Sequence, residues 1–111
     1  MGANTICRIK PTLHDGVLDL MIEHDCLEEL HERVALAVEC VPDVQQLEVR
    51  LLSDPDEEGR CWVVMAALVP PHINRQTCLE LQAAYIRKVV QRAFPTRLQF
   101  SFILRVEPET P

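Results

Sequence analysis

The chain has 111 residues, of which 48% are hydrophobic and 25% charged, and its formal net charge is -6. This length suits a single domain, and the composition is that of an ordinary folded globular chain. The negative charge argues against nucleic acid or an anionic membrane as the main partner. No apolar run reaches the roughly 18 residues that a membrane helix needs, and no signal peptide is visible, so we expect no membrane insertion.

Cysteines are frequent but do not form a Cys-x-x-Cys pair. An odd number of such cysteines is typical of reduced thiols rather than of a disulfide framework, and it favours a cytoplasmic protein. Cys26 alone has a polar setting, and the carboxylates of Asp25 and Glu28 oppose thiolate formation there, so we expect a structural thiol. The five cysteines are Cys7, Cys26, Cys40, Cys61 and Cys78.

The first 24 residues give the weakest signals of secondary structure. Residues 5–9 are compatible with a short strand or an ordered tail. Residues 17–22 form a short apolar run after Gly16, which fits either a first strand or part of a helix that begins near Thr12. We favour the strand.

A first helix is predicted over residues 26–41. Asp25 resembles an N-cap, and Glu28 three residues later completes a pair like a capping box. Pro42 ends the helix. The apolar residues at helical spacing are Leu27, Leu30, Val34, Val38 and Val41.

A β-hairpin is predicted over residues 45–69. Residues 45–53 alternate between polar and apolar, which is typical of a strand with one wet face. Residues 53–59 form an acidic turn that resembles the start of a calcium loop, but Met65 stands where such a loop needs Glu, so we expect a solvated hairpin tip. Residues 60–69 are apolar on both sides, and such a strand needs both faces covered.

A second helix and a last strand complete the predicted domain. Asn74 is a good N-cap for a helix over residues 75–94. Residues 98–106 alternate between apolar and polar, and Pro108 closes this strand. The basic residues Arg87, Lys88, Arg92 and Arg97 suit a solvated helix end rather than an anion site. The predicted core stripe of the helix is Leu79, Ala83, Ile86, Val90 and Phe94.

The predicted order of elements is (β)-α-β-β-α-β. It indicates an α+β, ferredoxin-like, two-layer sandwich, with an antiparallel sheet and two helices on one face. We expect one domain over residues 1–111, with loosely ordered tails at 1–12 and 108–111.

Three residues near the first helix are candidate metal ligands. His24, Glu28 and His31 are spaced by four and three residues, so they would line one face of a helix that began early enough to include His24. A divalent metal such as zinc is the expected cofactor in that case. The alternative is a polar outer face, because the cap at Asp25 places His24 just outside the helix. No residue pattern identifies a catalytic nucleophile or an acid–base pair.

Four short motifs lie at turns of the predicted fold: Val41-Pro42-Asp43-Val44, Gly59, Phe94-Pro95 and Val106-Glu107-Pro108-Glu109. In these motifs and in element order over about residues 27–109, the chain resembles the cytoplasmic C-terminal domain of cation diffusion facilitator transporters. The resemblance implies an α-β-β-α-β module that dimerises and binds divalent metal. The chain departs from the family pattern at Asp43, where Gly is usual, and at Arg105, where a metal-binding His is common. The six membrane helices are absent from this sequence.

We therefore expect a small, non-catalytic, homodimeric module with a regulatory or scaffold role, extending to divalent-metal sensing, and with a transporter or an enzyme as a partner protein. The predicted dimer interface is the uncovered side of the hairpin and last strand: Trp62, Val64, Ala66, Leu68 and Ile103. Alternatively, the N-terminal 24 residues fold back over this side. Two other functions are compatible with the sequence, a metal-binding protein that uses the N-terminal His/Asp/Glu cluster and a small-molecule or enzymatic site on the open sheet face.

Overall fold

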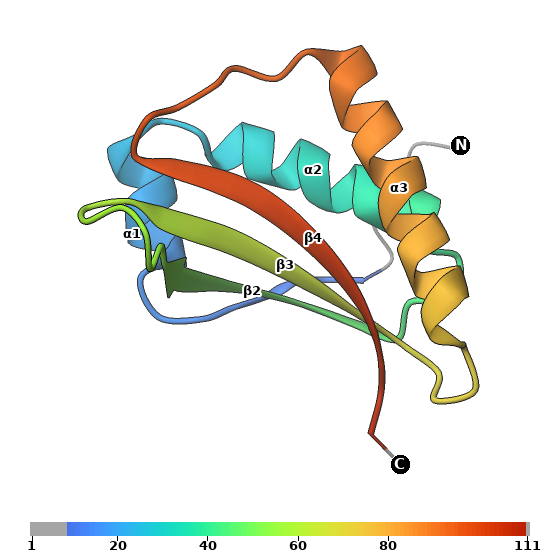
Figure 1. The fold of residues 1–111 in the computed structure, drawn as a ribbon. Helices are drawn as coiled ribbons and strands as arrows, with labels where there is room; N and C mark the ends of the chain where they lie inside the picture. The colour runs from blue at the N-terminus through green and yellow to red at the C-terminus, as the bar shows by residue number, and fades with distance from the viewer. Residues whose placement is uncertain (1–8, 111) are drawn as a thin grey trace.

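A computed structural model describes residues 9–110. It has one four-stranded sheet in the order β1-β2-β3-β4 and three helices, which pack against one face of that sheet (Figure 1). The predicted α+β class is confirmed. The elements are β1 (Thr12–Leu13), α1 (Val17–Glu23), α2 (Leu27–Cys40), β2 (Gln46–Ser53), β3 (Cys61–Val69), α3 (Arg75–Arg92) and β4 (Phe100–Pro108).

The sheet is mixed, so the antiparallel, ferredoxin-like arrangement predicted from the sequence is wrong. β2 and β3 are antiparallel, whereas β1 pairs parallel with β2 and β4 pairs parallel with β3. In a split βαβ arrangement the first strand would lie between β3 and β4. Here α3 carries the chain directly to the free edge of β3, and the two-residue β1 lies at the far edge of the sheet.

The predicted β-hairpin is confirmed. β2 and β3 pair from Gln46 opposite Leu68 to Ser53 opposite Cys61. At the tip, the Asp56 N–H donates to Asp54 Oδ1 over 2.9 Å, an Asx-turn contact that shapes an acidic turn. The hairpin is therefore the part of the fold that local sequence pattern determines best.

The chain before α2 corrects two predictions. Residues 17–22 belong to helix α1 rather than to a strand, because Val17 and Met21, four residues apart, both enter the core. Asp25 is not an N-cap: its backbone has a φ of 51°, and no side chain caps α2, whose N-cap position is Cys26. The left-handed residue turns the chain between two successive helices, and the Cys26 N–H donates to the Met21 carbonyl over 2.9 Å.

The cap of α3 is confirmed, but its predicted inward stripe is wrong. Asn74 Oδ1 accepts a hydrogen bond from the Thr77 N–H at 2.8 Å. Cys78 and Tyr85 are the buried residues of the helix. Gln82 also faces the sheet, where its Oε1 accepts from the N–H of Val106 on β4. The helix is thus rotated by about 100° from the predicted orientation, and four residues of the predicted stripe are exposed: Leu79, Ala83, Ile86 and Val90.

The core lies between the helices and the odd-numbered side of β3. It is almost wholly aliphatic, which explains how a chain with few aromatic residues can still form a closed core. The main contributors to the core are Leu30, Val34 and Ala37 from α2, Leu47 and Val49 from β2, Val63, Met65, Ala67 and Val69 from β3, and Leu104 and Val106 from β4.

Among residues 9–110, no helix is long and apolar enough to cross a membrane.

Candidate functional site

The sheet face opposite the helices is the interface that the sequence predicts. Its central column comes from β3, and the strand registers place Arg50 and Ile103 on either side of Val64. Figure 1 shows the three helices on the other side of the sheet. Residues 9, 13, 17, 20 and 21 also pack on the helix side, so this part of the N-terminal segment does not fold over the open face. Residues 1–8 lie outside the described part of the chain.

Burial differs sharply among the five predicted interface residues. Val64 and Ala66 are each only 1% exposed in the single chain. Trp62, Leu68 and Ile103 keep part of their surface exposed. The apolar area that this face could give to a partner is therefore smaller than the sequence suggests.

Two charged residues on the same face, Glu48 and Arg105, have partners within the chain. They flank Ala66 on the neighbouring strands. His14 Nε2 lies 3.0 Å from Glu48 Oε1, and Arg105 Nε lies 3.6 Å from Glu107 Oε2. Arg50, beside Val64, takes part in no ion pair within residues 9–110, so only part of the charge on this face is satisfied by the single chain.

A more exposed apolar surface lies on α3, and we call it the α3 stripe: Leu79, Ala83, Ile86 and Val90. These residues are spaced by four, three and four, which is the a/d spacing of a helix that packs along a second helix. Leu79, Ile86 and Val90 are 46%, 59% and 71% exposed. Sequence reasoning missed this surface because it assigned the stripe to the core.

A second series on α3 could have revealed the stripe. Cys78, Gln82, Tyr85 and Val89 have the same four-three-four spacing, and this series faces the sheet. A helix with two such series has more apolar surface than one protein core can cover. The sequence alone does not say which series faces inward.

Two opposite charges lie beside the α3 stripe on the side away from the sheet. Glu80 and Arg87 are both exposed, and within residues 9–110 neither takes part in an ion pair. Glu80 only accepts a 3.3 Å hydrogen bond from Gln76 Nε2. By contrast, Lys88 lies 3.5 Å from Glu39 on α2, and Arg92 pairs with Glu32. The helix therefore uses Lys88 and Arg92 for contacts with α2 and leaves Arg87 available.

The three candidate metal ligands are not brought together. His24 is the C-cap residue of α1, and its ring lies edge-on to Phe100, with 5.1 Å between the ring centroids. Glu28 and His31 are exposed on α2, and no group of three His, Cys, Asp or Glu side chains within residues 9–110 is arranged to hold a metal ion. The helix that would align all three residues is interrupted by the turn at Asp25.

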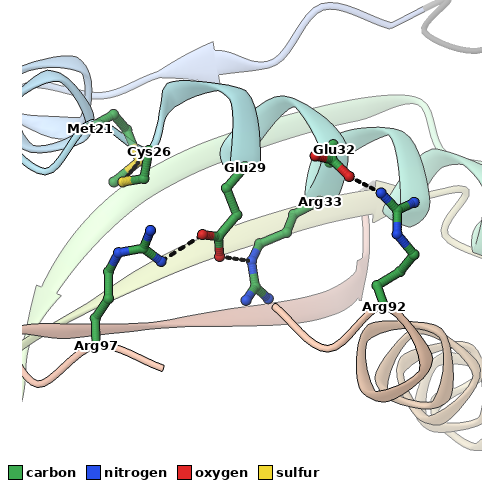
Figure 2. Close-up of polar contacts among 7 residues, drawn as sticks. All are labelled: Met21, Cys26, Glu29, Glu32, Arg33, Arg92 and Arg97. Carbon is green, nitrogen blue, oxygen red and sulfur yellow. Dashed lines mark hydrogen bonds and ion pairs between the residues drawn. The ribbon is translucent and has the colours of Figure 1, made fainter. Parts of the chain in front are cut away.

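The cysteines in the described part of the chain are free thiols: Cys26, Cys40, Cys61 and Cys78. Burial raises the pKa of each of these thiols above its ordinary value, which lowers the population of the reactive thiolate. Cys26 donates to Met21 Sδ at 3.5 Å inside the core, as Figure 2 shows. This contact supports a packing role for Cys26.

The comparisons with protein-family models, with curated proteins and with solved structures give no match for this chain. The resemblance to the cation diffusion facilitator domain therefore remains a hypothesis that is drawn from turn motifs and element order.

Proposed function

We propose that the protein is a small, non-catalytic module that acts as a cytoplasmic homodimer, with a regulatory or scaffold role. The observation that carries the proposal is the α3 stripe, whose large side chains stay exposed although they have the spacing of a helix–helix seam. A second copy of the chain fits this surface better than an unrelated partner does, because the surface is complementary to itself.

A twofold axis near the middle of α3 would place the two helices antiparallel. Leu79 of one copy then faces Val90 of the other, and Ala83 faces Ile86. A small residue opposite a large one lets the two seams interdigitate. A helix of 18 residues is about 27 Å long, which gives room for both repeats of these contacts.

Charge complementarity supports the same arrangement. In an antiparallel pair, Glu80 of one copy lies beside Arg87 of the other on the solvent side of the seam, and symmetry forms this contact twice. Neither residue has an ion-pair partner within the described chain. Paired charges at the rim of an interface add specificity more than affinity, so they fix the antiparallel direction.

The open sheet face is the weaker candidate for the interface. Two of its five predicted residues have no surface left to bury, and two of its charged residues, Glu48 and Arg105, already have partners within one chain. The order α2-β2-β3-α3-β4 is the order that the family resemblance implies, which supports dimerisation without favouring either surface.

Sedimentation equilibrium at micromolar concentration tests the proposal. The intact protein should be a dimer, and Glu80→Arg or Arg87→Glu alone should raise the dimer dissociation constant about tenfold or more, because each places like charges together. The double variant Glu80→Arg/Arg87→Glu should restore the dimer, since it exchanges the two charges. This rescue would not occur if the single changes acted by disturbing the fold.

Ile103→Lys is the matched test of the sheet face, because its long aliphatic stem can keep the local packing. We expect this variant to remain dimeric. A monomeric intact protein would overturn the proposal, and a dimer that Ile103→Lys breaks while the α3 variants do not would move the interface to the sheet.

A further inference from the structure

A cavity of about 340 Å³ lies between the C-terminal end of α3, the loop that follows it and the start of β4. This loop is the long connection from α3 to β4 in Figure 1. The volume is at the small end of the range for small-molecule sites. The lining combines apolar and cationic side chains, chiefly Arg33, Val89, Val90, Phe94, Arg97 and Phe102.

Arg33 is the most constrained side chain at this cavity. It is only 8% exposed, and its guanidinium carbon lies 4.4 Å from the ring centroids of both Phe94 and Phe102. Two aromatic faces at this distance hold a guanidinium by cation–π contact. The fork of N–H donors is therefore fixed in direction before any ligand arrives.

The charge of the site is positive overall. Glu29, itself 8% exposed, accepts from Arg33 Nε at 2.8 Å and from Arg97 Nη1 at 2.6 Å (Figure 2). Two guanidinium groups against one carboxylate leave one unbalanced positive charge. The same contacts hold the loop after α3 against α2, so Glu29 already has a structural role.

The terminal nitrogens of Arg33, Nη1 and Nη2, take no part in the contacts with Glu29. Arg33 donates to Glu29 through Nε alone, and Figure 2 shows no bond to either of its terminal nitrogens from the residues drawn. Within residues 9–110, no hydrogen bond of normal length joins these nitrogens to another group. The buried Tyr85 hydroxyl lies near them: burial raises its pKa, and the Arg33 guanidinium opposes that shift. This hydroxyl can take only part of the four terminal N–H donors. Unused donors on a nine-tenths buried guanidinium are costly, because charged groups gain most from hydrogen bonding. Arg33 lines the cavity, which is where an acceptor can reach these donors.

We propose that the cavity binds an organic monocarboxylate with a small apolar body. A carboxylate matches a guanidinium with two parallel hydrogen bonds, and its single charge balances the one unpaired positive charge of the site. The apolar body would lie against the walls formed by Val89, Phe94 and Pro95. A phosphate dianion fits less well, because it exceeds the available charge and finds few donors on these walls.

Isothermal titration of the intact protein with hexanoate, 1-hexanol and inorganic phosphate tests the ligand class. Hexanoate should bind, and backbone amide signals of Phe94, Ser101 and Phe102 should shift in the nuclear magnetic resonance spectrum. 1-Hexanol has the same chain without the carboxylate, so it should bind at least about tenfold more weakly. Equal binding of both compounds would leave only an apolar pocket and would overturn the proposal, as would binding of phosphate alone or of none of the three.

Arg33→Lys tests the assigned residue. Lysine keeps the positive charge and can still approach Glu29, but it lacks the planar fork, so hexanoate affinity should fall about tenfold. Arg75→Gln is the matched control, because Arg75 is an exposed arginine at the start of α3, the opposite end from the cavity, and does not line it. It should bind hexanoate as the intact protein does. Unchanged binding by a folded Arg33→Lys variant would overturn the role of the fork. Val90 belongs both to the cavity lining and to the α3 stripe, so all three proteins are compared at one concentration, where their oligomeric state is the same. Neither variant alters the stripe.

Discussion

β3 and α3 both carry apolar side chains on two sides, but α3 leaves far more of its second side exposed than β3 does. On β3, Val64 and Ala66 point away from the helices and are nevertheless 1% exposed. On α3, Ile86 and Val90 point away from the core and are 59% and 71% exposed. Both elements have apolar residues on two sides in the sequence, but the second side is buried at the centre of β3 and exposed on α3.

The difference comes from the spacing of neighbouring elements. Strands in a sheet lie about 4.8 Å apart, so we infer that the side chains of Arg50 and Ile103 shield Val64 from both sides. Packed helices lie about 8–10 Å apart, and α3 has a helical neighbour, α2, on one side only. The neighbouring strands of a sheet can therefore cover the side chains of a central strand, whereas a two-sided helix at the end of a layer keeps its second side exposed in the single chain.

The largest expected effect comes from placing a charge on the shielded side of β3. Val64→Asp should lower the free energy of unfolding by about 3 kcal/mol or more, because an unpaired carboxylate would be buried at a site that is 1% exposed. Urea denaturation measures this loss. Ile86→Asp, at a position that is 59% exposed, should change the stability of the monomer by only about 0.5 kcal/mol. A loss below about 1 kcal/mol for Val64→Asp would mean that water reaches the second side of β3, and the comparison would fail.

A smaller effect is expected at the start of α3, where the cap fixes the first turn of the helix. Asn74→Ala removes the acceptor for the Thr77 N–H and should cost about 1 kcal/mol of stability. Asn74→Asp keeps an acceptor oxygen at the same place and should be close to neutral. If both variants lose stability equally, the side-chain cap is not what holds the start of this helix.

Local sequence signals predicted the parts of the fold that local physics determines. The hairpin, the Asn74 cap and the last strand depend on alternation, turn residues and capping within a few positions. Residues 17–22 were assigned wrongly because a six-residue apolar run fits a strand and a helix equally well. The order of the strands could not be predicted, since it depends on which strand edge each connection reaches.

The two surfaces on which the proposals rest were harder to predict than the fold. The sequence shows two apolar series on α3, and only the packed structure shows that the series with Tyr85 faces inward. The contact between Glu29 and Arg97 joins residues 68 positions apart, so no local pattern contains it. Arg97 was assigned from the sequence to a solvated helix end, although its guanidinium lies 2.6 Å from a buried carboxylate. The three candidate metal ligands are not grouped for a related reason, since a single left-handed residue at Asp25 separates His24 from the helix that holds Glu28.

The smallest change in stability is expected from a cysteine placed at position 79, next to native Cys78. Position 79 belongs to the exposed α3 stripe and Cys78 faces the core, so the reactivity of the two thiols tests the orientation of α3 directly. Leu79→Cys replaces a residue that is 46% exposed and should alter stability by less than about 0.5 kcal/mol. Native Cys78 is 4% exposed, and burial raises the pKa of its thiol, so little thiolate is present and little of it is accessible.

Alkylation with iodoacetamide, followed by peptide mass spectrometry, should therefore modify the thiol introduced by Leu79→Cys well before Cys78. Raising the protein concentration into the dimeric range should slow only the first reaction, because the α3 stripe is then covered by the second copy. Equal rates at the two positions would mean that α3 is rotated toward the orientation predicted from the sequence. In that case the α3 stripe would belong to the core, and the open face of the sheet would be the better candidate for the dimer interface.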